Sequence, residues 1–336
     1  MRRGFAAAAL GLVALATSQA HAGSPTAGEW LQRMTESLAS LNYDGLFTHT
    51  AGRQSETMRI VHRVEDGRSL ERLVSLDGSG REIVRTPEEI HFYMPDRRVV
   101  LVEPRSDEGS LLKALPAPGP RLDELYRLEV SKGNRLLGRE VRVLDVRPRD
   151  AYRYGYRLWL DEKTAMPLRS EVLNVEGKAV EAIHFTKLET LERIDPHELE
   201  PAVDATGFQW VRAGKRAEQR VVVSGWRPSK IPPGFRLVAT RTQIVPGVPV
   251  PVQHLIFSDG FASVSVFIEP GMAKGPAPPE STSVGSANAF STQVRGYVVT
   301  AVGEVPAATV RDIATSLAPV DEAVAPAAPA PDAKNR

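Results

Sequence analysis

The segment from residue 151 to residue 173 constrains the fold most strongly, because its side chains alternate in character with the two-residue period of a β-strand. The apolar positions are Tyr152, Tyr154, Tyr156, Leu158 and Leu160, and the positions between them are Arg153, Gly155, Arg157 and Trp159. Residues 161–167 supply a turn, since Asp161 can accept hydrogen bonds from the local backbone and Pro167 cannot donate one to a neighbouring strand. We therefore expect a β-hairpin with one apolar face.

Short strand-like segments surround this hairpin. They cover residues 45–50, 58–64, 69–76, 81–85, 90–93, 97–103, 137–146 and 180–188. Dipeptides such as Asp66-Gly67 and Asp77-Gly78 lie between them and are typical of tight turns that join antiparallel neighbours. A single sheet of about ten strands has to curl to bury one face, which favours a barrel or half-barrel over a flat sheet.

Two helices are predicted beside these strands. The first covers residues 26–41, where Thr26 and Glu29 fit a capping box. Its apolar positions are Trp30, Met34, Leu38 and Leu41. The second is predicted for residues 121–130, which place several apolar side chains on one side of a helix. We expect the first helix to cover the concave side of the curled sheet.

The beginning of the chain has the three regions of a secretory signal peptide. Arg2 and Arg3 are followed by an apolar run and by the small residues of Ala20-His21-Ala22, so cleavage is expected before Gly23. The apolar run is shorter than the roughly 20 residues that a membrane-spanning helix needs. We therefore expect an exported, soluble mature protein.

The length of the chain and a break in the strand pattern indicate two domains. A chain of 336 residues exceeds what one core usually supports, and Asp195-Pro196 and Glu200-Pro201 interrupt the strands. A second series of strands and a helix at 306–317 follow. The expected order is a signal peptide at 1–22, a large domain at 23–200, a linker at 201–218, a small C-terminal domain at 219–318 and a disordered Ala/Pro-rich tail at 319–336.

The sequence contains no motif typical of a catalytic, metal-binding or cofactor-binding site. It has no cysteine, and its four strand histidines, His49, His62, His91 and His184, lie on separate predicted strands. Isolated sheet histidines that hydrogen-bond locally are far commoner than catalytic or metal clusters. The 42 Lys and Arg residues nearly balance the 41 Asp and Glu residues, which is not the charge of a nucleic-acid-binding protein. We expect no enzymatic activity, no metal, no cofactor and no nucleic-acid partner.

Apolar side chains on the predicted strands allow two interpretations. In the large domain these are Leu46, Met58, Ile60, Phe92, Leu101, Tyr154, Tyr156 and Leu158. They form either an ordinary core or a cavity for an acyl chain, because incompletely closed barrels can hold ligands. In the second domain, Trp226, Phe235, Phe261 and Phe267 are likewise either core residues or a patch that docks a peptide.

Six longer blocks of sequence together carry a resemblance to a known family. They are LNYDG at 41–45, RIVHRVEDG at 59–67, ERLVSLDGSGREIVR at 71–85, YRYGYRLWLD at 152–161, FSDGFASVSVFIEP at 257–270 and VVTAVGEVPAATV at 298–310. In this order they resemble the RseB/MucB family of periplasmic regulators of the sigma-E envelope-stress response. The resemblance covers nearly all of the chain after the signal peptide, and the last two blocks are the most distinctive.

The resemblance implies an α+β, mostly antiparallel fold. The large domain would be similar to the LolA/LolB lipoprotein carriers, a half-open barrel with covering helices, and a smaller antiparallel α+β domain would follow it. The resemblance also implies a non-enzymatic function in the periplasm, which is to bind the periplasmic segment of an anti-sigma factor, RseA or MucA, and to shield it from proteolysis. Lipopolysaccharide or another amphiphile would release that segment.

Two functions therefore compete, a regulator that binds a protein partner and a carrier of lipid or lipoprotein. The second domain distinguishes them, because a simple carrier fold would end near Leu199. The sequence decides neither the identity of a lipid nor whether the protein forms a homo-oligomer.

Overall fold

The structure is a computed structural model that describes residues 25–105, 121–212, 225–243, 251–271 and 279–320. Its large domain contains one 12-stranded sheet in the order β12-β6-β5-β4-β3-β2-β1-β11-β10-β9-β8-β7. The strands are β1 (Asn42–Ala51), β2 (Gln54–Glu65), β3 (Arg68–Ser75), β4 (Glu82–Arg85), β5 (Glu89–Met94), β6 (Val99–Pro104), β7 (Tyr126–Lys132), β8 (Val141–Pro148), β9 (Gly155–Asp161), β10 (Pro167–Leu173), β11 (Ala179–Leu191) and β12 (Gln209–Arg212). Neighbouring strands are antiparallel except for β12 and β6, which run parallel.

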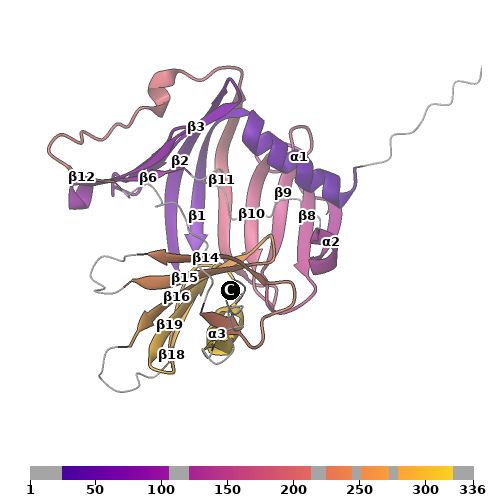
Figure 1. The fold of residues 1–336 in the computed structure, drawn as a ribbon. Helices are drawn as coiled ribbons and strands as arrows, with labels where there is room; N and C mark the ends of the chain where they lie inside the picture. The colour runs from indigo at the N-terminus through magenta and orange to yellow at the C-terminus, as the bar shows by residue number, and fades with distance from the viewer. Residues whose placement is uncertain (1–24, 106–120, 213–224, 244–250, 272–278, 321–336) are drawn as a thin grey trace, which may run out of the picture.

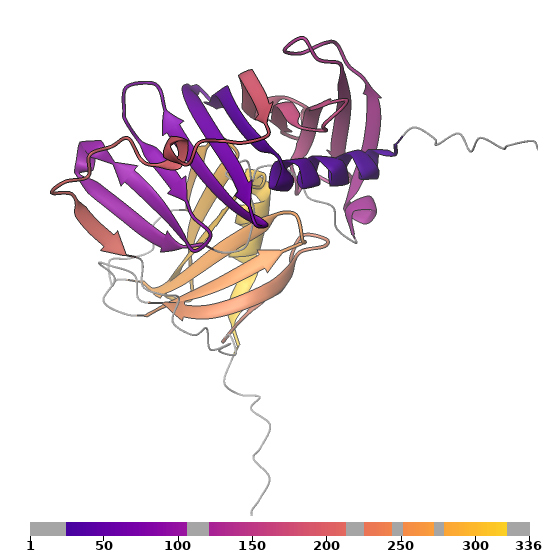
Figure 2. The same cartoon turned by 90° about the horizontal axis from the view of Figure 1, so that it is seen from above.

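The sheet curls but does not close, because β12 and β7 form separate edges (Figure 1). Helix α1 (Ala27–Ser40) lies on the concave side, with its axis across the strands (Figure 2). This arrangement confirms the half-open barrel and its covering helix.

The predicted hairpin is formed by β9 and β10. Across this pair, Tyr156 lies opposite Val172 and Leu158 opposite Ser170. In the turn, Asp161 Oδ1 accepts hydrogen bonds from the backbone N–H groups of Lys163 (2.7 Å) and Thr164 (2.9 Å). The local hydrogen bonding expected of an aspartate at this position is confirmed.

Helix α1 begins with the predicted capping box. The N–H of Thr26 donates to Glu29 Oε2 (2.6 Å), and the N–H of Glu29 donates to Thr26 Oγ1 (3.2 Å). The buried side of the helix consists of Trp30, Leu31, Met34 and Leu38. Full burial of a large apolar side chain contributes roughly 1.5–3 kcal/mol, so this stripe is what holds the helix against the sheet.

The helix predicted for residues 121–130 is wrong beyond its first turn. The structure has only α2 (Leu122–Leu125), and β7 begins at Tyr126. Tyr126, Leu128 and Val130 all contact the core of the large domain, which is the period of a strand. Pairing of β7 with β8 along its whole length therefore overrides the local helical pattern.

The segment after β11 follows the convex side of the sheet. It contains a short 3-10 helix, η2 (Pro196–Leu199), where Leu199 packs with Ile194 and Val61. Further along, three apolar residues cover four buried strand residues: Val203, Ala205 and Phe208 pack on Val84, Tyr93, Val100 and Val102. Strand β12 then joins the sheet edge. The described part of the expected linker, residues 201–212, thus lies against the large domain.

The small domain is a six-stranded antiparallel sheet in the order β14-β15-β16-β19-β18-β17, with one face covered by α3 (Ala307–Ser316). Its strands are β14 (Arg236–Gln243), β15 (Val252–Ser258), β16 (Ser263–Pro270), β17 (Glu280–Val284), β18 (Ala287–Val294) and β19 (Tyr297–Gly303), and β13 (Trp226–Pro228) pairs with β20 (Leu317–Pro319). The domain lies at one end of the large-domain strands (Figure 1). The smaller antiparallel α+β domain is confirmed.

Two expectations fall on parts of the chain that the structure leaves undescribed. The signal peptide at 1–22 lies outside the described residues, as does the tail predicted at 319–336 from residue 321 onward. Pro319, expected in the tail, instead belongs to β20 and lies opposite Trp226. Within the described ranges, no helix has both the length and the apolar character needed to cross a membrane.

Candidate functional site

The residues predicted to line a lipid cavity occupy several different environments. Ile60 and Leu158 are both 0% exposed and belong to the core that includes α1. Met58 and Tyr156 are partly buried against that core, and burial raises the pKa of Tyr156. Tyr154 is buried where the large domain meets the small domain. The side chains of helix α1 therefore fill part of the predicted cavity, and that part is packed core.

Leu46 does not line the concave side. Tyr43 and Phe47 face the core beneath α1, and successive side chains of a strand point to opposite faces. Leu46 consequently lies on the convex face, opposite Arg59, whose guanidinium contacts Glu198 of η2 at 2.8 Å. The core position in this part of β1 is Phe47.

Phe92 and Leu101 remain on the concave face away from α1. They lie directly opposite each other on β5 and β6, and Phe92 also lies opposite Ile83, which contacts the large-domain core. Both are half-buried and belong to none of the core clusters of the described residues. Figure 1 shows α1 over the opposite half of the sheet, so these two residues are the best-placed apolar candidates.

A row of three ionisable side chains crosses the concave face on β2, β3 and β4. His62, Glu71 and Arg85 lie opposite one another on these strands and are only 1–2% exposed. Arg85 donates to Glu71 Oε2 at 2.7 Å. His62 Nδ1 lies 2.8 Å from the carbonyl oxygen of Leu41, so this nitrogen carries the hydrogen. Burial lowers the pKa of His62.

Sequence reasoning treated these three residues as unrelated, although a pattern of charges at facing strand positions could have paired them. The register of the sheet brings them together as a buried, mutually paired row. In the described part of the chain, no group of three His, Cys, Asp or Glu side chains could hold a metal ion.

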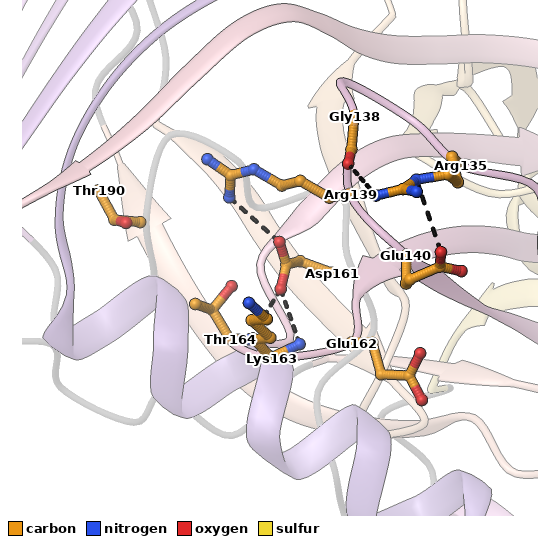
Figure 3. Close-up of a pocket in the computed structure, with 9 residues that line it drawn as sticks. All are labelled: Arg135, Gly138, Arg139, Glu140, Asp161, Glu162, Lys163, Thr164 and Thr190. Atoms are coloured by element: carbon orange, nitrogen blue, oxygen red, sulfur yellow. Dashed lines mark hydrogen bonds and ion pairs between the residues drawn. The ribbon is translucent and has the colours of Figure 1, made fainter.

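A polar pocket of about 470 Å³ lies beside α1 at the β9–β10 turn (Figure 3). Asp161 projects into it and pairs with Arg139 at 3.1 Å. Burial opposes ionisation of Asp161, but hydrogen bonds from the backbone of Thr164 and Lys163 and the charge of Arg139 outweigh it and lower the pKa. These interactions hold the turn in shape, and they account for the buried charge without a catalytic role.

The two domains meet at a buried arginine that sequence reasoning assigned to the polar face of the hairpin. Arg153 is 0% exposed, and its Nε donates to Asp259 Oδ2 of the small domain at 2.5 Å. Its other nitrogens donate to Asp150 and to the carbonyl oxygen of Pro233, and its guanidinium lies 5.1 Å from the ring centre of Phe235. No periodic signal distinguishes this arginine from Arg157, which is half-exposed.

A second contact between the domains centres on Glu181 of β11. His49 Nε2 lies 2.7 Å from Glu181 Oε1, and Ser286 of the small domain donates its hydroxyl to Oε2 at 2.6 Å. The hydrogen bond with Glu181 raises the pKa of His49, and the same bond lowers the pKa of Glu181. Asn288 Nδ2 of the small domain also donates to the Tyr154 hydroxyl of the large domain at 2.8 Å.

The four aromatic residues predicted to bind a partner have different surroundings. Trp226 and Phe235 are 5% and 4% exposed and belong to the small-domain core. Phe261 packs edge-on against Tyr126 of the large domain, with ring centres 5.6 Å apart. Phe267 is half-buried on the sheet face turned away from α3, so it is the candidate outside both the core and the junction.

Comparison with known proteins covers both domains. The family model of the MucB/RseB N-terminal domain matches residues 26–203, and that of the MucB/RseB C-terminal domain matches residues 220–318. The sigma factor AlgU regulatory protein MucB of Pseudomonas aeruginosa is 34% identical over 297 residues, which cover 87% of this chain and 91% of that protein. The sigma-E factor regulatory protein RseB of Escherichia coli K12 is 27% identical over 309 residues, 88% of this chain and 91% of RseB.

A solved structure shares the two-domain architecture. A crystal structure of MucB in complex with MucA(peri) matches with a TM-score of 0.69 and 33% identity, and the match covers 88% of this chain and 99% of that chain. The relatives are named as regulatory proteins and not as enzymes. With both family models matched in order, the chain belongs to the MucB/RseB family.

Proposed function

We propose that this protein is a periplasmic, non-enzymatic negative regulator of sigma-E-type envelope-stress signalling. It binds the periplasmic segment of an RseA/MucA-like anti-sigma factor and shields that segment from regulated proteolysis. The observation that carries the proposal is the match to MucB in complex with MucA(peri), which extends over 99% of the MucB chain. A lipid carrier of the large-domain type would need no small domain.

A pull-down with the mature chain as bait tests the proposal. Detergent-solubilised envelope of the source cells is the prey, and recovery of a single-span anti-sigma factor is the expected result. Recovery of lipoproteins without any anti-sigma factor would support the carrier function instead.

The proposal includes export and the domain limits expected from the sequence. The mature chain begins at Gly23, and the small domain covers residues 219–318. The large domain up to residue 200 is followed by the segment 201–218, whose described part joins the large-domain sheet through β12. N-terminal sequencing of protein from the periplasmic fraction is expected to read from Gly23. An uncleaved chain in the cytoplasm would contradict export.

We further propose that an amphiphile releases the partner by binding at Phe92 and Leu101 on the concave face. Each methylene of an acyl chain that is buried there contributes about 0.8 kcal/mol, so a few of them outweigh a modest partner affinity. Binding is reciprocal, because a ligand that favours the partner-free state binds more weakly when the partner is present.

Titration of lipopolysaccharide into a complex with the anti-sigma segment tests this step. The apparent affinity for the segment is expected to fall, and Leu101→Arg is expected to blunt the fall by placing a charge among apolar groups. Leu46→Arg is the matched control, since Leu46 is also half-buried but lies on the convex face. If lipopolysaccharide binds and segment affinity is unchanged, the protein is a passive shield.

A further inference from the structure

The small domain contacts the large domain around two charged side chains, Arg153 and Glu181. Thr309 Oγ1 also donates to the carbonyl oxygen of Tyr152 beside Arg153, at 2.9 Å. The contact around Arg153, called the anchor here, is the ion pair of Arg153 and Asp259, whose side chains are both 0% exposed. Gly234 lies against it with φ of +84°, and a Cβ there would lie 2.7 Å from Arg153 Nη2. The contact around Glu181, called the latch here, is the turn between β17 and β18, where Ser286 donates to Glu181.

Opening the anchor would leave buried charges without partners. The guanidinium of Arg153 donates to Asp259, to Asp150 and to the carbonyl oxygen of Pro233. The second oxygen of Asp259 accepts the N–H of Phe261 at 2.8 Å, so both oxygens of the carboxylate are hydrogen-bonded. Separating the members of such a buried pair is strongly unfavourable, and the anchor is expected to stay closed.

Opening the latch leaves no charge without a partner. Glu181 keeps its 2.7 Å contact with His49, and its side chain is already 17% exposed, so water can replace Ser286. The contact between Asn288 and the Tyr154 hydroxyl can be lost in the same way, because the Asn288 amide has a second acceptor inside the small domain at 2.8 Å. The latch is therefore the weaker of the two fastenings.

The latch turn contacts the large domain through small residues, Gly285 and Ser286. All five residues of β17 are exposed, and Val284 is 65% exposed. Gly285 has φ of +58°, and a Cβ there would lie 2.9 Å from the Cβ of Ala51. The turn fits closely against the end of β1 but contributes no core side chain, so it can leave and return without repacking either core.

From this asymmetry we propose that the small domain is hinged: the latch releases Glu181 while the anchor stays closed, and the domain pivots about Arg153. The open state exposes Tyr154 and the adjoining ends of β1 and β11. Any ligand that binds one of the two states better shifts their populations by its difference in affinity. The hinge depends only on contacts within this chain and not on which partner the protein binds.

Distance measurements between pairs of spin labels test the hinge, because a chain without cysteine accepts labels at chosen sites. Gln54→Cys with Val284→Cys reports on the latch, and Asp123→Cys with Lys230→Cys reports on the anchor; all four residues are exposed. Ser286→Ala is expected to shift the latch pair to longer distances and to leave the anchor pair at one narrow distance. Glu181→Gln is expected to act in the same direction.

Ser283→Ala is the matched control, since Ser283 is an exposed serine on β17, and it is expected to change neither distance. A latch distance that stays unchanged in both Ser286→Ala and Glu181→Gln would overturn the proposal. Lengthening of both pairs together would also overturn it, because the domains would then separate as whole bodies.

Discussion

At position 45 of β1 the sheet has room for nothing larger than glycine. A Cβ on Gly45 would lie 2.5 Å from Cε1 of Phe185, a core ring that is 1% exposed and packs 5.4 Å from Phe47. Gly45→Ala is therefore expected to lower the free energy of unfolding by about 1–3 kcal/mol through overpacking. Urea denaturation measures the change.

Gly28→Ala is the control for that substitution. No atom lies within 4 Å of a Cβ on Gly28, which belongs to helix α1. Alanine favours a helix over glycine by up to about 1 kcal/mol, so this variant is expected to gain stability. A similar gain in both variants would show that Phe185 moves aside for the new methyl group.

The pair of His49 and Glu181 predicts a dependence of stability on pH. The raised pKa of His49 means that its contribution is fully present below the ordinary value of 6.5 and is lost as pH rises through the folded-state pKa. The lowered pKa of Glu181 means that its contribution is present above 4.5 and is lost as pH falls. The pair thus stabilises most between these values.

Unfolding measurements on His49→Gln test the direction in which the contribution of His49 to stability changes with pH. The loss of stability relative to the natural chain is expected to be larger at about pH 5.5 than at about pH 8.5. A loss of equal size at both pH values would mean that protonation of His49 adds nothing to the contact.

At the scale of elements, the segment that covers the convex face predicts a pattern of proteolysis. Its polar, proline-containing composition is that of a cleavable linker, yet Phe208 and Val203 pack on buried strand residues. Residues 201–212 are therefore expected to resist a protease that cuts an exposed chain. Phe208→Asp is expected to release the segment and create cleavage there, whereas Asp204→Asn, at an exposed position, should leave it protected.

Alternation of side chains predicted the β9–β10 hairpin, and the spacing of Thr26 and Glu29 predicted the capping box of α1, because both depend on neighbours close in sequence. The number of strands predicted the curled sheet. Local pattern reasoning has limits. It failed at Tyr126, where pairing with β8 selects a strand. It also failed to distinguish Arg153, because the partner that buries this residue, Asp259, is 106 residues away. Strand register and domain docking depend on residues far apart in the sequence, and alternation within one segment carries no signal for either.

At the scale of the whole molecule, the anchor is expected to make the two domains unfold together. Arg153→Ala leaves Asp259 buried without its cation, which costs about 3–5 kcal/mol. Calorimetry is expected to show one transition for the natural chain and two for the variant. Arg157→Ala removes a half-exposed arginine of β9 that pairs with Asp145 of the neighbouring strand β8. A loss of at most about 1 kcal/mol with one transition is expected.

Strand β12 pairs with β6, so the chain leaves the large domain at the end of β12. The connection to the small domain therefore begins after that strand. Only residues 213–224 connect β12 to Gly225, and about twelve residues reach no farther than about 40 Å. While the anchor stays closed, the released turn remains close to its own binding place on the same molecule. Closing is consequently a first-order event within one molecule, and its rate does not depend on how many copies of the protein the cell contains.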